Sequence, residues 1–125
     1  FGWASVAVGA FHQWKADHIV AETNNGGEMV EHVIRTVDDK IPYRAVTASR
    51  GKQTRAEPVH MLYEQARVHH AGTFELLEDQ MCSWNPETDA KSPDRMDALV
   101  WGLTDLLVTP VKTGWSGLTG KPVTA

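Results

Sequence analysis

The sequence predicts an α/β fold in which at least part of the sheet is parallel. Two short β-type segments, 18–22 and 43–48, alternate with segments of helical periodicity. Strands that alternate with helices of about 10–15 residues are typical of parallel strand–helix–strand units. The length of 125 residues suits one domain with a single core. We expect the last helix to pack across the sheet.

The N-terminal half is predicted to run helix, strand, helix, strand. A first helix over about 3–15 is indicated by apolar residues near one face, which are Val6, Ala10, Phe11 and Trp14. The strand 18–22 leads into a glycine-rich turn at 24–27. Helical spacing then predicts a second helix on Met29, Val30, Val33, Ile34 and Val37. This helix should end near Asp38-Asp39, because Pro42 breaks it before the strand 43–48.

The C-terminal half is predicted to be mainly helical. A helix over about 55–66 would carry Pro58 in its first turn, where proline is tolerated. Its inward-facing residues would be Val59, Leu62, Tyr63 and Ala66. A short strand at 68–71 and a helix over 74–82 are expected next, followed by a loop over 84–91.

The last helix is the best marked element. Ser92 is a good N-cap residue and Pro93 a good first helical residue. A continuous apolar stripe follows, made by Met96, Leu99, Val100, Leu103, Leu106 and Leu107. We expect one domain over 1–109, and an extended or mobile tail over 110–125.

Composition excludes several classes of protein. The apolar runs are far shorter than the roughly 20 residues of a membrane span, and no secretory signal opens the chain. Cys82 is the only cysteine, so it is expected to be a small buried residue in a reducing compartment. The net charge of −4 argues against a dedicated duplex-binding module, but not against an enzyme that keeps acidic residues for metal.

Three acidic residues are candidates for a metal site. Glu22 ends a strand, and sites in open α/β sheets collect at the carboxyl ends of strands. Asp94 and Asp97 lie one turn apart at the start of the last helix. A helical wheel favours Asp97 as the residue nearer the sheet, because Asp94 points away from the apolar stripe. The simpler alternatives are a solvated strand end and acids that stabilise the helix dipole.

Carboxylates that converge in this way suit a hard divalent cation. Mg²⁺ and Mn²⁺ prefer oxygen ligands and retain several waters. Two such ions about 4 Å apart can activate water and stabilise the leaving oxygen in phosphodiester cleavage. The acidic residues therefore permit a metal-dependent nuclease without requiring one.

A basic segment follows the second strand. Arg50, Lys52 and Arg55 flank a glycine there and suit contact with DNA phosphates, the alternative being a solvated polar loop. His69 and His70 are adjacent, and neighbouring residues of a strand point to opposite faces, so a shared metal ion is not expected. The five tryptophans are interpreted as core or interface residues.

Four blocks of the chain, taken in order, resemble the nuclease domain of tailed-phage large terminase subunits. They are IVAETNNGGEMV at 19–30, the segment 48–68 with its SRGKQTRAEPV core, LEDQM at 77–81 and SPDRMDALVW at 92–101. The similarity extends over about residues 3–108. It implies an RNase H-like fold, with a mixed sheet flanked by helices. It also implies an acidic cluster to which Glu22 and Asp94 belong as metal ligands, with Asp97 as a further catalytic acid, and it moves the first choice from Asp97 to Asp94.

The resemblance implies a Mg²⁺- or Mn²⁺-dependent endonuclease that cuts concatemeric duplex DNA during genome packaging. The complete domain would hold two metal ions. The full protein would add an ATPase domain, would work with a small terminase subunit and a portal, and would act in the host cytoplasm from a phage or prophage gene.

The chain departs from the family pattern at its start. The first strand of the family, with its aspartate, should precede the opening helix, and Asp17 precedes the wrong strand to replace it. We therefore expect a fragment with part of the metal site and slow or absent cleavage. One alternative is a non-catalytic module that binds DNA or a packaging partner. Another is a homo-oligomer formed through an open sheet edge.

Overall fold

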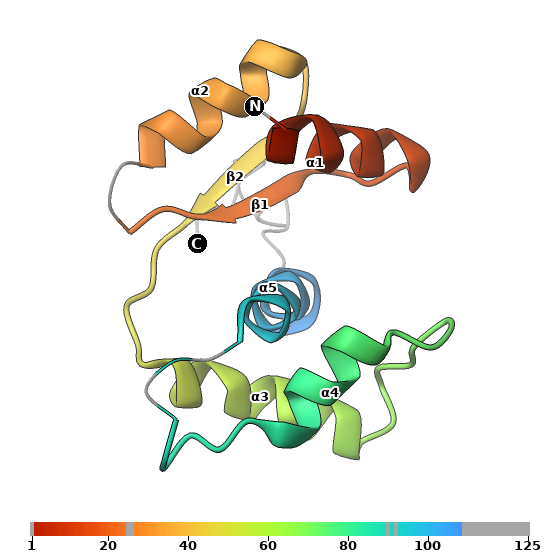
Figure 1. Ribbon diagram of the computed structural model, residues 1–125, viewed down its shortest axis with the longest axis vertical. Coiled ribbons are helices and arrows are strands. Elements are labelled where there is room, and N and C mark those ends of the chain that lie inside the picture. Colours follow the sequence, from red (N-terminus) through yellow and green to blue (C-terminus); the bar gives the residue numbers. More distant parts are fainter. Residues whose placement is uncertain (1, 25–26, 90, 92, 109–125) are drawn as a thin grey trace, which may run out of the picture.

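The computed structural model describes residues 2–24, 27–89, 91 and 93–108. In Figure 1 the upper part of the molecule holds two helices and two strands, the lower part holds two helices, and a further helix lies between them. The elements are α1 (Gly2–Gln13), β1 (Ile19–Glu22), α2 (Gly27–Val37), β2 (Tyr43–Val46), α3 (Lys52–Glu64), α4 (Glu75–Ser83), α5 (Asp94–Leu103) and the π-helical turn η1 (Thr104–Val108).

The sheet consists of β1 and β2, which are parallel and joined through α2. Ile19 pairs with Tyr43 and Glu22 with Val46, so both strands end at one edge. This confirms the parallel α/β prediction. The larger mixed sheet of the resemblance is not seen in the part of the chain that the structure describes, where no further strand lies beside β1. The structure therefore supplies the strand end that carries Glu22.

A small core joins α1 and α2 above the sheet. It is made by Ala4, Val8, Ile34 and Ile41, with Phe11 packed against it. The predicted inner face of α1 is wrong at Val6 and Trp14, which are 73% and 77% exposed, and at Ala10, which is also exposed. Apolar residues surround this helix on most sides, so its periodicity could not show which stripe packs inward.

Helix α3 begins three residues earlier than predicted, at Lys52, so Pro58 lies inside the helix and not in its first turn. Pro58 is exposed, and a proline there leaves one helical carbonyl without its usual amide partner. Val59 and Leu62 are buried as expected. Ala66 is exposed instead, with a positive φ of 54°, because the chain turns there to end the helix.

Two further predictions in the lower part are wrong. No strand forms at 68–71, because His70 is held by side-chain hydrogen bonds to Tyr63 (Oη to Nε2, 2.8 Å) and Glu78 (Nδ1 to Oε1, 3.1 Å). These contacts agree with a structural role for His70, while His69 is exposed. Cys82 is exposed and not buried, since it lies on α4, a helix without any fully buried residue.

The start of α5 also differs from the expectation. Pro93 is the N-cap residue and Asp94 the first helical residue, whereas the predicted cap, Ser92, lies outside the described residues. A side chain of α4 replaces the missing cap: the Gln80 Oε1 atom accepts hydrogen bonds from the backbone N–H groups of Arg95 (3.1 Å) and Met96 (3.3 Å). Helix α4 thus fixes the end of α5 that carries Asp94.

The apolar stripe of α5 is shorter than predicted. Met96 and Val100 are buried, but Leu106 and Leu107 are 65% and 40% exposed. The helix widens to π geometry at Thr104, which changes the phase of the residues that follow. The predicted tail at 110–125 lies outside the described residues.

Candidate functional site

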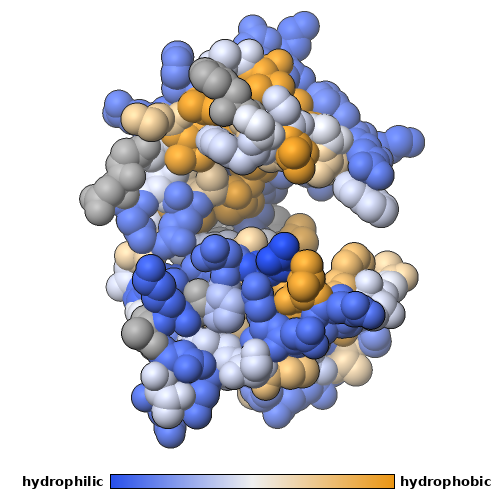
Figure 2. Space-filling view, in the orientation of Figure 1, coloured by the Kyte–Doolittle hydropathy of each residue, from blue (hydrophilic) through white to orange (hydrophobic). Residues whose placement is uncertain are grey.

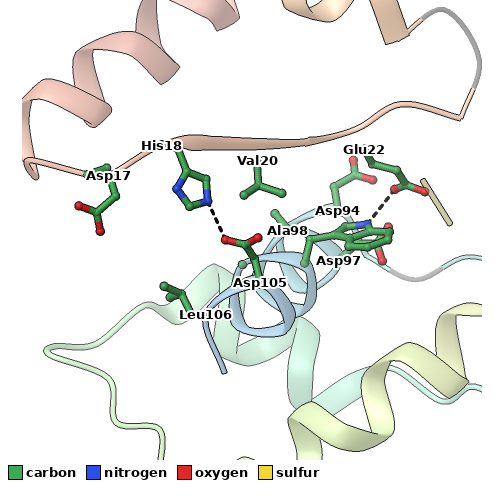
Figure 3. A pocket seen from close by; sticks show the side chains of 12 residues that line it. Asp17, His18, Val20, Glu22, Asp94, Asp97, Ala98, Asp105 and Leu106 are labelled. Carbon is green, nitrogen blue, oxygen red and sulfur yellow. Dashed lines mark hydrogen bonds and ion pairs between the residues drawn. The ribbon is translucent and has the colours of Figure 1, made fainter. Parts of the chain in front are cut away.

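A cavity of about 590 Å³ lies between β1 and α5, and it contains all three predicted acidic residues. One wall is lined by Val20 and Glu22 of β1 and by His18, the residue just before the strand. The opposite wall is formed by Asp94, Asp97, Ala98, Trp101, Gly102, Asp105 and Leu106 of α5 and η1. Figure 3 shows Glu22, Asp94 and Asp97 gathered at one end of the cavity, and His18 with Asp105 at the other.

Glu22 is held firmly by its surroundings. Its Oε1 atom accepts a hydrogen bond from Asn24 Nδ2 at 2.7 Å, and its Oε2 atom accepts one from Trp101 Nε1 at 3.1 Å. Asn24 is itself fixed, because its Oδ1 atom accepts the backbone N–H of Ala48 at 3.2 Å. The Glu22 carboxylate therefore has a defined orientation at the end of its strand.

The turn after Glu22 explains why glycine is needed there. A Cβ atom on Gly27 would lie 2.3 Å from the Cβ atom of Thr23, a distance that no side chain tolerates. The Thr23 backbone N–H donates to Val46 O at 2.9 Å, which extends the pairing of the strands by one residue. The close approach of α2 thus depends on glycine and keeps the chain tight beside Glu22.

The two aspartates of α5 have different environments. Asp94 is exposed, and within the described ranges no hydrogen bond or ion pair involves its carboxylate. The Asp97 side chain is 18% exposed and forms ion pairs with two basic side chains. Lys52 Nζ lies 3.5 Å from its Oδ2 atom, and Arg55 Nη2 lies 3.4 Å from its Oδ1 atom. Asp94 is therefore available to a cation from solvent, whereas Asp97 is already neutralised.

The three basic residues predicted to contact DNA do not behave alike. Arg50, two residues before α3, and Lys52, the first residue of α3, are exposed. The Arg55 side chain is only 9% exposed, with its guanidinium carbon 4.7 Å from the ring centroid of Trp101. Its Nη1 atom also donates to the carbonyl of Arg50 at 2.9 Å. Arg50 is open to a phosphate at the surface, Lys52 is exposed but paired with Asp97, and Arg55 faces inward.

An ion-paired cluster that sequence reasoning missed closes the far end of the cavity. The Asp105 side chain is 7% exposed and accepts hydrogen bonds from His18 Nε2, at 2.7 Å, and from Arg44 Nη1. Burial raises the pKa of Asp105, but the bonds from His18 and Arg44 lower it by more, so the pKa lies below its usual 3.8. The cluster joins β1 and β2 to η1. One sequence signal pointed to this cluster. His18 lies two positions before Val20 and four before Glu22, so strand alternation places all three side chains on the same face.

The donor set of the cavity fits a hard cation better than a zinc ion. Oxygen atoms of Glu22 and Asp94 are the ligands that Mg²⁺ and Mn²⁺ prefer. Among the described residues there is no group of three or more His, Cys, Asp or Glu side chains with metal-binding geometry. Two carboxylates nevertheless suit Mg²⁺, which commonly binds one or two carboxylates and completes its shell with waters and substrate phosphates.

Carboxylates gathered at the carboxyl end of a parallel strand make this an α/β domain with a candidate site for a divalent cation. A family model described as the terminase RNaseH-like domain matches residues 2–106, and the chain belongs to that family. This confirms the resemblance seen in the sequence, and it makes the chain a nuclease-type domain of a phage terminase. Neither curated proteins nor solved structures give a match. The helices of the described residues are too short or too polar to cross a membrane.

Proposed function

We propose that this chain is a metal-dependent endonuclease domain that cleaves duplex DNA during phage genome packaging. Glu22 and Asp94 would hold Mg²⁺ or Mn²⁺, which supplies an activated water and charge stabilisation for hydrolysis of a phosphodiester bond. The observation that carries the proposal is that Glu22 and Asp94, which come from a strand end and a helix start 72 positions apart, line one cavity.

The roles of the chain's own residues follow from their contacts. Asn24 and Trp101 orient the Glu22 carboxylate, so the ligand does not need to reorganise when a cation arrives. Asp94 faces solvent and can accept the cation without first breaking an ion pair. Arg50 and Lys52 lie on the surface at the start of α3, where they can bind phosphates on either side of the cleaved bond.

The charge of the protein supports a requirement for metal in DNA binding. The net charge is −4, and the cavity wall carries Glu22 and Asp94. Two carboxylates would repel a phosphate that approached alone. A bound divalent cation neutralises these two negative charges, so cation and DNA should bind cooperatively at this end of the cavity.

Metal titration of the whole chain tests the proposal. Mn²⁺ binding is measured by electron paramagnetic resonance of the free ion, for the wild type and for Glu22→Gln and Asp94→Asn, with exposed Asp79→Asn as a control for the lost charge. We expect at least a tenfold loss of affinity in the two site variants and none in the control. Wild-type affinity in Asp94→Asn would overturn the assignment. Plasmid nicking under the same conditions then reports cleavage.

The surface position of Arg50 and Lys52 leaves a non-catalytic function as the second candidate. A module that only docks DNA would bind it without metal, and its affinity would fall with salt and on loss of these two cations. In the complete terminase, the ATPase domain, the small terminase subunit and the portal would be the remaining partners, and host cytoplasm the location.

A further inference from the structure

We infer that Trp101 and Arg55 are positioning residues, which set the Glu22 carboxylate for the metal without touching metal or DNA. The inference rests on the proposed metal site. It assigns functions to an indole that the sequence suggested was core material and to an arginine that it suggested was a phosphate contact.

The first step is the hydrogen bonding of Glu22. A carboxylate offers about four lone-pair sites on its two oxygens. The Trp101 Nε1–H group occupies one site on Oε2, at 3.1 Å, and the Asn24 amide occupies one on Oε1, at 2.7 Å. One lone pair on each oxygen remains for a cation. The two donors therefore fix the plane of the carboxylate while leaving its coordinating capacity intact.

The second step is the support of the indole. The Arg55 guanidinium lies over the ring of Trp101, 4.7 Å from its centroid. Trp101 and Asp97 are four residues apart on α5, so they share one face of the helix. Arg55 contacts both at once, because its Nη2 atom also lies 3.4 Å from Asp97 Oδ1. The indole is thus clamped between a cation from α3 and an acid from β1.

The third step concerns charge. The Arg55 side chain is 9% exposed, and a cation so deeply placed needs a compensating anion. Asp97 supplies that charge, with Lys52 Nζ at 3.5 Å as its second partner. Asp97 therefore acts on the site through Arg55 and not as a metal ligand. Successive contacts run from Glu22 to Trp101, from Trp101 to Arg55 and from Arg55 to Asp97. They link β1, α5 and α3 at the end of the cavity where Asp94 lies.

A role in DNA contact fits Arg55 less well. Its Nη1 atom is used by the carbonyl of Arg50 at 2.9 Å, and its Nη2 atom by Asp97. A phosphate would have to displace these bonds and enter a nearly buried position. Arg50 and Lys52, five and three positions earlier in the chain, are already exposed.

Trp101→Phe is the central variant, because it removes the N–H donor and keeps an aromatic ring beneath the guanidinium. The whole chain is used, and Mn²⁺ affinity is measured as above, together with thermal melting. We expect affinity to fall about tenfold, the usual effect of losing a group that orients a metal ligand. In the double variant with Glu22→Gln, Trp101→Phe should produce no further loss, because its partner is already changed.

Magnetic resonance gives a second readout that does not depend on activity. The indole N–H signal of Trp101 is identified by its absence in Trp101→Phe. It should shift on addition of Mg²⁺ with the same midpoint as metal binding. The indole of Trp14, which is 77% exposed just after α1, serves as the control and should not move.

The outcomes separate the two proposals. Unchanged metal affinity in both Glu22→Gln and Asp94→Asn would refute the proposed function. Suppose instead that Glu22→Gln and Asp94→Asn lose metal affinity while Trp101→Phe keeps the wild-type affinity. That result would refute only the positioning role of Trp101, as would a further loss of affinity when Trp101→Phe is added to Glu22→Gln. Arg55→Lys keeps the charge beside Asp97 but loses the planar face over the indole, so an intermediate affinity is expected. Arg55→Lys equal to the wild type would remove Arg55 from the inference.

Discussion

Replacing Asp105 by asparagine should destabilise the domain, because this residue joins three elements at one end of the cavity. Asp105 lies on η1 and accepts hydrogen bonds from His18, just before β1, and from Arg44 of β2. The asparagine has the same shape but no negative charge. Its amide group would also place a donor where the carboxylate had an acceptor.

The size of the effect follows from the exposure of the partners. A hydrogen bond to a charged group contributes about 1.5–3 kcal/mol when it is shielded from water. The Arg44 side chain is 49% exposed, so its pair is discounted to at most about 1 kcal/mol. The His18 side chain is 30% exposed and its partner 7%, which leaves its bond near the lower end of the range. The sum is about 2 kcal/mol, or roughly 8 °C in Tm at about 4 °C per kcal/mol.

The stabilisation by Asp105 should depend on pH, and the direction follows from its pKa. The pKa of Asp105 is lower in the folded protein than its usual 3.8, so the folded state binds fewer protons. Its contribution to stability is therefore complete above the unfolded pKa and lost as pH falls through the folded one. The difference in Tm between wild type and variant should be present at about pH 5 and should close in more acidic solution, as Asp105 becomes protonated.

Thermal melting followed by circular dichroism at several pH values measures both quantities. Asp39→Asn is the matched control, because it removes the same charge at an exposed position in the turn after α2. We expect a change in Tm close to zero for this control. A shift of less than about 2 °C for Asp105→Asn, or a difference that does not close in strongly acidic solution, would refute the reasoning.

Three further changes test the fold and the surface. Ile34 is 1% exposed in the core, so Ile34→Ala should reduce the free energy of unfolding by about 3 kcal/mol. Met29 is 71% exposed in the same helix, so Met29→Ala should change it little. Urea unfolding measures both, and equal effects would contradict the assignment of Ile34 to the core. Gln80→Ala removes the acceptor at the start of α5 and should reduce stability by about 1 kcal/mol and weaken Mn²⁺ binding, whereas Gln65→Ala should do neither. Arg50→Ala should lower the salt dependence of DNA binding by about 0.9 in log–log slope, measured by fluorescence anisotropy, with exposed Arg67→Ala as the comparison.

The order of elements in the N-terminal half was predictable from the sequence because each element has a local cause. The strand ends at Glu22 and the helix begins at Gly27, where the structure shows that only glycine fits against Thr23. The face of α1 was not predictable. A helix with apolar residues on most sides packs through Ala4 and Val8 only because α2 lies there, which is a tertiary fact.

The supports of the site were not predictable for a related reason. Trp101 and Glu22 are 79 positions apart, and no periodicity within α5 can show that an indole N–H meets a carboxylate on a strand. The same holds for Asp105 and Arg44, which are separated by 61 positions. In the sequence these residues resemble an aromatic core residue, a helix acid and a strand cation, and only their partners give them a function.

Asp94 and Asp97 show how burial resolves what spacing leaves open. The helical wheel favoured Asp97 as the acid nearer the sheet, and both residues do line the cavity. Proximity alone does not make a ligand, however, because a carboxylate that already neutralises two cations must release them before it can bind a metal ion. Asp94 has no such partner among the described residues and lies at the solvent side of the same turn. The less buried acid is therefore the better candidate ligand, and the more buried one is better suited to hold Arg55 in place.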